Sequence, residues 1–345
     1  MKPTARWPAA AHAPSSKVPG VTNMHAIRIS KTGGPEVLEL VEIDKPEPAP
    51  GQILIRHEAV GINFIDTYLR SGLYPLKLPA VLGGEAAGVV EAVGKDVTRF
   101  KVGDRVASAG VGGGYADYSV VSAGRAVAIP DGVDSRTAAA ALLKGMTVEF
   151  LLRGLHAVKS GETILVHAAA GGVGQIMVQW AKAIGAVVIA TVGSEAKAAR
   201  VRELGADHLI LYRDQDVAAE VRRITDGKGV SVAYDSVGKD TFEGTLKSIA
   251  RRGLFVSFGN ASGPPPPIEG RQLMLNGSLF FTRPTMNDYQ VTTEELDASA
   301  KALFDMIGSG KIKIEIGQTF TLANARLAHE ALEGRATIGA SLLIP

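Results

Sequence analysis

The chain has 345 residues, a formal net charge of +2 and no cysteine. This length suits two domains of ordinary size, and a hydrophobic fraction of 46% is sufficient for their cores. The near-neutral charge excludes a global field that would attract nucleic acid or a membrane, and the missing cysteines exclude disulfides and cysteine-bound zinc. We therefore expect the chain in a reducing compartment, the cytoplasm.

The first 23 residues differ from the rest. They hold four prolines, three basic residues, many alanines and no acid, a composition that buries little apolar surface. We expect residues 1–23 to form a disordered extension. Two other interpretations are a transit peptide and a start of translation at Met24.

Residues 24–146 are predicted to be rich in β-structure. Short runs of strand-forming residues alternate with turn signals such as Gly33-Gly34-Pro35 and Pro130-Asp131-Gly132. Strands are expected at 26–30, 53–61, 88–93, 105–108, 115–122 and 126–129. This pattern favours a barrel-like unit.

The periodicity changes after Gly145. Apolar runs recur near residues 164, 187, 209, 231, 254 and 279, with helical periods between several of them. That alternation is typical of βα units around a parallel sheet. We predict a doubly wound Rossmann domain at 147–285, inserted into a β-rich domain made of 24–146 and 286–345. In the last segment, helices are expected near 294–309 and 322–333, and strands near 312–320 and 340–344.

A glycine motif follows the first of these strands. Residues 168–174 have the sequence AAAGGVG, which is the dinucleotide fingerprint with alanine in place of its first glycine, between a strand at 163–167 and an amphipathic helix. Gly171 would let the backbone approach a pyrophosphate, and Gly174 would let the helix pack closely on the strand. The helix N-terminus adds free N–H groups and a positive dipole end. The motif predicts dinucleotide binding, and the alternative is an ordinary glycine turn.

The end of the second strand, 187–191, indicates which dinucleotide binds. Folds that prefer NAD place an acid there, whereas this chain has Val192-Gly193-Ser194. Ser194 is a candidate helix cap, and Lys197 lies three residues further on, where it would attract a 2′-phosphate. Glu195 is the counter-argument, because its carboxylate would repel that phosphate. We predict a preference for NADPH over NADH.

Together, six sequence blocks resemble the medium-chain dehydrogenase/reductase superfamily and, within it, the zeta-crystallin-like NADPH:quinone oxidoreductases. The blocks are GGPEVL (33–38), GINFIDTY (61–68), KGMT (144–147), HAAAGGVG (167–174), YDSVG (234–238) and SFGN (257–260). The resemblance runs from Met24 to Pro345. It implies a GroES-like β-domain and a Rossmann domain with the cofactor in the cleft between them.

The resemblance also implies a set of site residues. Asn63 and Tyr68 would face the nicotinamide region, with cofactor-binding and catalytic roles. Thr147 and the turn Phe258-Gly259-Asn260 would lie on the nicotinamide side. The other cofactor-binding positions are Gly171, Gly172, Val173 and Gly174 at the pyrophosphate, Ser194, Lys197 and Tyr212 around the 2′-phosphate, and Gly193 and Arg335.

Two departures from the zinc alcohol dehydrogenases of this superfamily bear on metal binding. Those enzymes carry a Gly-His-Glu ligand motif where this chain has Gly83-Gly84-Glu85, and their cysteine ligand falls at Asn63. Glu85 alone cannot hold zinc, because catalytic zinc takes three protein ligands. We expect an enzyme that works without metal.

Three functions follow from the resemblance. They are NADPH-dependent reduction of quinones, NADPH-dependent reduction of an alkenal or enone double bond, and a non-enzymatic role as an RNA binder or crystallin. RNA binding lacks a basic patch or a stacking-aromatic motif to support it. Quinone reduction is preferred, by hydride transfer from nicotinamide to acceptor without a covalent intermediate. Asn63 would donate to a developing oxyanion or hold the nicotinamide amide, and Tyr68 offers a ring face and a hydroxyl. The alternative is that both only shape the cleft.

A homodimer is also expected. Leu279-Phe280-Phe281-Thr282 is the last strand of the predicted Rossmann sheet, and an apolar edge strand is a liability unless it is paired. The resemblance implies that two such edges pair across a two-fold axis.

Overall fold

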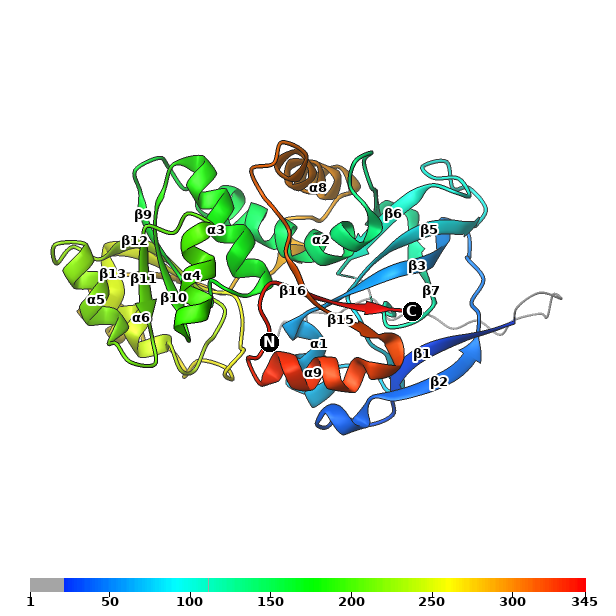
Figure 1. Ribbon diagram of the computed structural model, residues 1–345, viewed down its shortest axis with the longest axis horizontal. Helices are drawn as coiled ribbons and strands as arrows, with labels where there is room; N and C mark the ends of the chain where they lie inside the picture. The colour runs from blue at the N-terminus through cyan, green and yellow to red at the C-terminus, as the bar shows by residue number, and fades with distance from the viewer. Residues whose placement is uncertain (1–21, 111) are drawn as a thin grey trace. The chain divides into compact units, whose positions relative to one another are not determined.

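The computed structural model describes residues 22–110 and 112–345, so the disorder predicted for 1–23 falls almost wholly outside the described residues. The chain divides into two compact units, whose elements Figure 1 labels. Unit 1 holds the described residues up to Leu143 together with Ile316–Ala336 and Ala340–Pro345. Unit 2 holds Lys144–Glu315 and Thr337–Gly339.

Unit 1 is built on two sheets. The larger sheet has the strand order β15-β16-β3-β5-β6-β8, with β7 also paired to β3, and the smaller has the order β2-β1-β4. All pairs are antiparallel except β15 with β16. The strands are β1 (Asn23–Ile29), β2 (Glu39–Asp44), β3 (Gln52–Ile62), β4 (Ala80–Val81), β5 (Glu85–Val93), β6 (Arg105–Ala109), β7 (Tyr118–Ser122), β8 (Ala126–Ala128), β15 (Ile316–Thr321) and β16 (Ala340–Ile344).

Three helices accompany these strands. They are α1 (Phe64–Ser71), α2 (Ser135–Glu149), whose last residues belong to unit 2, and α9 (Ala325–Glu333). Short 3-10 turns lie at Pro35–Val37, Ala123–Arg125 and Leu322–Asn324. Ala325 and Ala328 of α9 pack into the apolar core around Ile27 and Val60. Helices α1 and α2 and strand β2 were not predicted from the sequence.

Unit 2 is a parallel sheet with the strand order β11-β10-β9-β12-β13-β14. Numbered within this unit, the order is 3-2-1-4-5-6, which is the order of the doubly wound Rossmann fold, the fold class that the sequence predicted. The strands are β9 (Thr163–Val166), β10 (Val187–Val192), β11 (His208–Leu211), β12 (Val230–Asp235), β13 (Ile249–Ser257) and β14 (Phe280–Thr282). β14 lies at the edge of the sheet, as predicted.

Helices cover both faces of this sheet. Val221 of α5 and Phe242 of α6 pack on the strand residues Leu165 and Ile189, while α3 and α4 lie on the other side of the sheet in Figure 1. The helices are α3 (Gly172–Ile184), α4 (Glu195–Glu203), α5 (Val217–Ile224), α6 (Phe242–Ser248), α7 (Gly270–Leu275) and α8 (Thr293–Gly308), with a π-helix at Phe150–Leu155 and a 3-10 turn at Met286–Asp288. Within the described residues, no helix is long and apolar enough to cross a membrane.

The unit limits differ from the predicted domain limits at the second junction. The sequence placed that junction at 285–286, whereas unit 2 continues to Glu315. The reason is that α8 packs inside unit 2: the Ser299 hydroxyl donates to Glu149 at 3.0 Å. Lys313 also exchanges two hydrogen bonds with Gln179 of α3, so the strand expected from 312 begins only at Ile316.

Candidate functional site

The glycine motif forms the turn between β9 and α3. A Cβ atom added at Gly174 would lie 2.4 Å from the Ala168 carbonyl oxygen and 2.6 Å from the Ala169 Cα atom, so only glycine fits there. At Gly171, the residue before α3, the nearest atom to an added Cβ would be the Ala168 oxygen at 3.4 Å. An added Cβ at Gly171 would meet no other atom within 4 Å, so there is room beside this residue for a pyrophosphate to approach the helix N-terminus.

A buried lysine lies beside this turn. The side chain of Lys144 is 5% exposed, and its Cδ and Cε atoms would lie 2.8 and 3.0 Å from a Cβ added at Gly172. Gly172 and Val173 are the first two residues of α3. A cation next to a helix N-terminus increases the positive potential that an anionic ligand meets. Lys144 lies in the sequence KGMT (144–147), and the sequence pattern indicated no role for it.

Four of the predicted cofactor residues gather after β10 and β11. The Ser194 hydroxyl caps α4 by accepting the Lys197 N–H at 3.4 Å, as expected. A Cβ added at Gly193 would lie 2.9 Å from the Tyr212 hydroxyl oxygen, so the glycine leaves room for that ring. Glu195, whose carboxylate would repel a phosphate, is exposed in the first turn of α4.

The turn Phe258-Gly259-Asn260 follows β13 and rests on the end of β12. The Phe258 N–H donates to the Asp235 carbonyl oxygen at 2.8 Å. A Cβ added at Gly259 would lie 2.4 Å from the Ser236 carbonyl oxygen. Thr147 lies in the last turn of α2, where its hydroxyl is 4.0 Å from the Met286 sulfur.

A buried polar network holds the strand ends below these turns. The His167 ring is 2% exposed, with Nδ1 3.0 Å from the Thr191 hydroxyl and Nε2 2.9 Å from the Thr245 hydroxyl. Thr245 and Thr241 both donate to the Asp235 carboxylate. Burial lowers the pKa of His167, so the ring is neutral at pH 7. The network ties β9, β10 and β12 together at their carboxyl ends, and the sequence analysis did not predict it.

In unit 1, Asn63 and Tyr68 lie at the start and in the middle of α1. The Asn63 backbone N–H donates to Asp66 Oδ2 at 2.9 Å, and its side-chain Nδ2 donates to Glu85 Oε2 at 2.9 Å. The Tyr68 ring is 8% exposed and packs edge-on against Tyr74, with the ring centroids 5.4 Å apart. Both predicted catalytic residues are therefore held by their neighbours.

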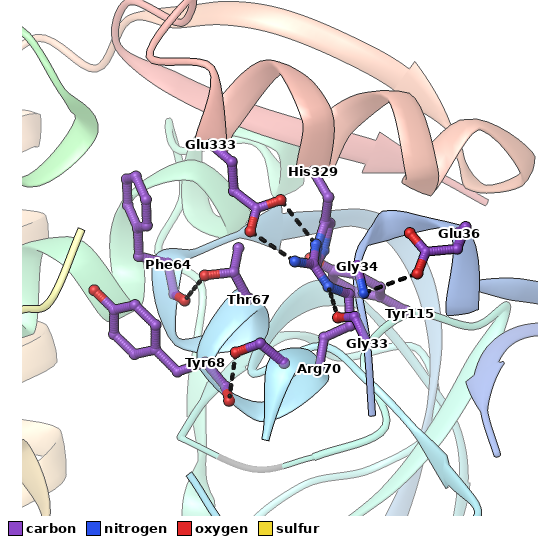
Figure 2. Close-up of polar contacts among 11 residues, drawn as sticks. Gly33, Gly34, Glu36, Phe64, Thr67, Tyr68, Arg70, Tyr115, His329 and Glu333 are labelled. Carbon is purple, nitrogen blue, oxygen red and sulfur yellow. Dashed lines mark hydrogen bonds and ion pairs between the residues drawn. The ribbon is translucent and has the colours of Figure 1, made fainter. Parts of the chain in front are cut away.

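A charged network fixes the other side of α1. Arg70 donates to both oxygens of Glu333, at 3.0 and 2.6 Å, and to His329 Nδ1 at 2.9 Å (Figure 2). His329 Nε2 is 3.0 Å from the Tyr115 hydroxyl, which donates to Asp66 at 2.9 Å. In Figure 2, Phe64 and Tyr68 point away from this network.

The network has a defined proton arrangement. Because a guanidinium can only donate, Nδ1 of His329 must accept, so its proton lies on Nε2 and points to Tyr115. Burial, with Arg70 adding to the effect, lowers the pKa of His329 to about 3. Burial and the nearby Asp66 raise the pKa of the Tyr115 phenol. The imidazole is therefore neutral at pH 7.

The candidate residues divide between the two units. Asn63, Tyr68 and Arg335 belong to unit 1, and the rest belong to unit 2. Arg335 follows α9 in the left-handed conformation, with φ of 56°. Within residues 22–110 and 112–345, no three histidine, aspartate or glutamate side chains form a group that could hold a metal ion.

Comparisons with known proteins place these features in a class. A family model described as alcohol dehydrogenase GroES-like domain matches residues 49–131, and one described as zinc-binding dehydrogenase matches residues 172–308. The fold and these two family matches together show that the chain is a medium-chain dehydrogenase/reductase.

Individual relatives show to which family within this superfamily the chain belongs. The quinone oxidoreductase of Pseudomonas aeruginosa is 51% identical over 321 residues, which cover 92% of this chain and 99% of that protein. The 2-haloacrylate reductase of a Burkholderia species is 44% identical over 92% of this chain and 98% of its own length. The crystal structure of Escherichia coli quinone oxidoreductase complexed with NADPH matches with a TM-score of 0.92 and 48% identity, over 93% of this chain and all of that one. The chain belongs to the quinone oxidoreductase family, as the sequence blocks indicated.

Proposed function

We propose that this protein reduces quinones with NADPH by direct hydride transfer. The observation that carries the proposal is the fingerprint turn, with open space at Gly171 and closed space at Gly174, on a chain about half identical to quinone oxidoreductases. The E. coli relative is described as complexed with NADPH, which supports the same cofactor here.

The residues of unit 2 suit NADPH in three places. The space beside Gly171 at the N-terminus of α3 and the neighbouring Lys144 suit the pyrophosphate. Ser194, Lys197 and Tyr212 offer two hydroxyls and a cation for the 2′-phosphate, with no acid at the end of β10. The turn 258–260 would border the nicotinamide.

When bound, the nicotinamide supplies the hydride. The protein contributes alignment, which alone is worth roughly 7 to 11 kcal/mol in favourable cases. We assign contacts with the nicotinamide region to Asn63 and Tyr68, and a further cofactor contact to Arg335. Quinones accept electrons readily and their reduced oxygens take protons from water, so no protein acid is required. No residue of the chain is assigned to a metal.

A second function has one observation in its favour. The relative from Burkholderia is named 2-haloacrylate reductase, so a chain 44% identical to this one acts on an unsaturated acid. Purified protein is to be assayed for NADPH oxidation with a series of quinones and alkenals. A higher kcat/KM for quinones supports the proposal, whereas a higher value for alkenals would replace it with double-bond reduction.

We also propose a cytoplasmic homodimer that forms through the β14 edge. Phe280 on β14 and the nearby Met274 and Leu275 are 63%, 60% and 67% exposed, an apolar surface that pairing would cover. Light scattering should give twice the chain mass of 36.0 kDa. Phe280→Asp should yield monomer, while Val291→Asp, at a site 71% exposed outside this edge, should not. A wild-type monomer at micromolar concentration would refute the dimer.

A further inference from the structure

Ala168, between β9 and the glycines of the fingerprint turn, has a strained backbone. Its φ of 52° lies in the left-handed region, which is less favourable for alanine than for glycine. The other non-glycine residues with positive φ in the part of the chain that the structure describes all have polar side chains. An alanine side chain forms no hydrogen bond that would favour this conformation, so neighbouring residues must hold it.

Ala168 shapes the turn through its carbonyl group. The Ala168 oxygen accepts the Gly171 N–H at 3.0 Å, and it would lie 2.4 Å from a Cβ added at Gly174. Rotation of Ala168 out of the left-handed region would redirect this oxygen, and Gly171 would lose its acceptor. The strained conformation is therefore part of the turn to which we assign the pyrophosphate.

Thr191, near the end of β10, holds the residues on both sides of Ala168. Its carbonyl oxygen accepts the Ala169 N–H at 3.1 Å, and its hydroxyl oxygen is 3.0 Å from Nδ1 of His167. The side chain of Thr191 is 1% exposed and that of His167 is 2% exposed, so water does not compete for this contact. Thr191, His167 and Ala169 together form a clamp around Ala168.

The hydrogen bonds of the clamp have a defined direction. The Thr245 hydroxyl lies 2.9 Å from the Asp235 carboxylate and 2.7 Å from the Thr241 carbonyl oxygen, both of which only accept. Its proton therefore goes to one of them, and its oxygen accepts from Nε2 of His167 at 2.9 Å. Because the ring is neutral, Nδ1 has no proton and accepts the Thr191 hydroxyl. Loss of that hydroxyl would leave a buried acceptor without its donor.

We propose that Thr191, acting through His167 and Ala169, is a positioning residue that holds Ala168 in its left-handed conformation and so keeps the turn formed for the pyrophosphate of NADPH. The inference rests on the proposed function, and all of its residues belong to unit 2. Thr191 acts on the fraction of molecules in which the turn is formed, and the apparent Kd rises as that fraction falls.

Thr191→Val removes the hydroxyl with little change in shape. Ala168 is then clamped on one side only, and it can relax toward conformations that alanine prefers. The Kd for NADPH, measured by cofactor fluorescence, should rise roughly tenfold, the factor by which an alanine disfavours the left-handed region. Thr191→Ser keeps the hydroxyl and should bind NADPH within about twofold of wild type.

Glycine at position 168 shows whether the effect passes through this residue. Glycine adopts positive φ without strain, so the turn no longer needs the clamp. Ala168→Gly combined with Thr191→Val should return the Kd to within about threefold of wild type. The same glycine in the wild-type background should change the Kd much less, because the clamp already holds the turn. A double variant that binds as weakly as Thr191→Val would overturn the inference.

Thr225→Val is the matched control for a general loss of stability. The Thr225 hydroxyl follows α5, donates to the Val221 carbonyl oxygen at 2.7 Å and accepts the Gly229 N–H at 2.8 Å. Gly229 precedes β12, so these two hydrogen bonds lie at the amino end of the parallel sheet, opposite the fingerprint turn. This variant should have a lower Tm and an unchanged Kd. A rise in Kd equal to that of Thr191→Val would contradict a specific role for Thr191.

Circular dichroism at the assay temperature confirms that each variant is folded. If Thr191→Val does not fold alone, the double variant decides, because it lacks the strain: it should fold and bind NADPH, and failure in either respect overturns the inference. If wild type binds no NADPH, the proposed function fails and the inference with it. If wild type binds NADPH but Thr191→Val binds it equally well, only the role of Thr191 fails.

Discussion

Alanine at two glycines of the same turn should have opposite consequences. At Gly174, a Cβ would lie 2.4 to 2.7 Å from three backbone atoms of Ala168 and Ala169, about 1 Å short of ordinary contact. Backbone cannot rotate away, so the turn must move. Overpacking of this kind costs about 1–3 kcal/mol. For a unit of this size that corresponds to a loss of about 2–10 °C in Tm.

Gly171→Ala should leave the free protein nearly unchanged. Its φ of −78° and ψ of 171° are open to any residue, and the added Cβ would meet only an oxygen at 3.4 Å. The methyl group would instead occupy the space proposed for the pyrophosphate. We expect a Tm within about 1 °C of wild type but a Kd for NADPH raised at least about tenfold.

Thermal unfolding without cofactor and fluorescence titration with NADPH measure the two effects separately. The expected pattern is a lower Tm for Gly174→Ala and weaker binding at an unchanged Tm for Gly171→Ala. Normal NADPH binding by Gly171→Ala would refute the assignment of this helix N-terminus to the pyrophosphate.

Lys197→Glu should raise the KM for NADPH at least about tenfold and that for NADH much less, because only NADPH carries the 2′-phosphate; equal effects would place the phosphate elsewhere. Tyr68→Phe should lower kcat with a quinone less than about tenfold, since no protein acid is required, and a loss of about a hundredfold would make the hydroxyl essential. Stability should fall in acid, because burial lowers the pKa of His57 to about 4 and of His329 to about 3. The unfolded chain binds these protons from about pH 6.5 downward and the native protein does not. Each histidine then lowers the free energy of unfolding by about 1.4 kcal/mol per pH unit between about pH 6 and its native pKa. Urea unfolding at pH 7 and at pH 5 measures this loss. Equal stabilities at the two pH values would contradict the buried neutral histidines.

The Rossmann strands were predictable because each carries its own local signal. The strand 163–167 is apolar and ends in a glycine motif, and α3 shows a clear helical period through Ile176, Met177 and Trp180. Gly185 ends that helix in the left-handed conformation, with φ of 97°, which glycine adopts without strain. The cap at Ser194 was predictable for the same reason.

Helix α1 was missed although its end signals were present. Asn63 and Asp66 stand at the positions of an N-terminal capping pair, and Gly72 ends the helix with φ of 83°. The eight residues of this helix, Phe64–Ser71, are too few for a helical period to stand out against the surrounding strands. Helix α2 was missed because its alanine-rich sequence lies in a segment interpreted as β.

The polar networks were beyond sequence analysis for a different reason. The Asn63–Glu85 bond joins residues 22 positions apart, and the Arg70–His329 bond joins residues 259 positions apart. Such pairs depend on which strands and helices become neighbours, and no periodicity along one segment contains that information. In the sequence, Glu85 is only the last residue of an incomplete zinc-ligand motif, whereas in the structure it accepts a hydrogen bond from Asn63.

The most direct test of the account follows NADPH and a quinone together in protein that has been dialysed against a strong chelator. We predict that NADPH is oxidised in proportion to the quinone reduced, at the rate of untreated protein, and that NADH is used much less efficiently. Loss of this activity on dialysis with recovery on adding zinc, or a failure to reduce any quinone with NADPH, would contradict the account.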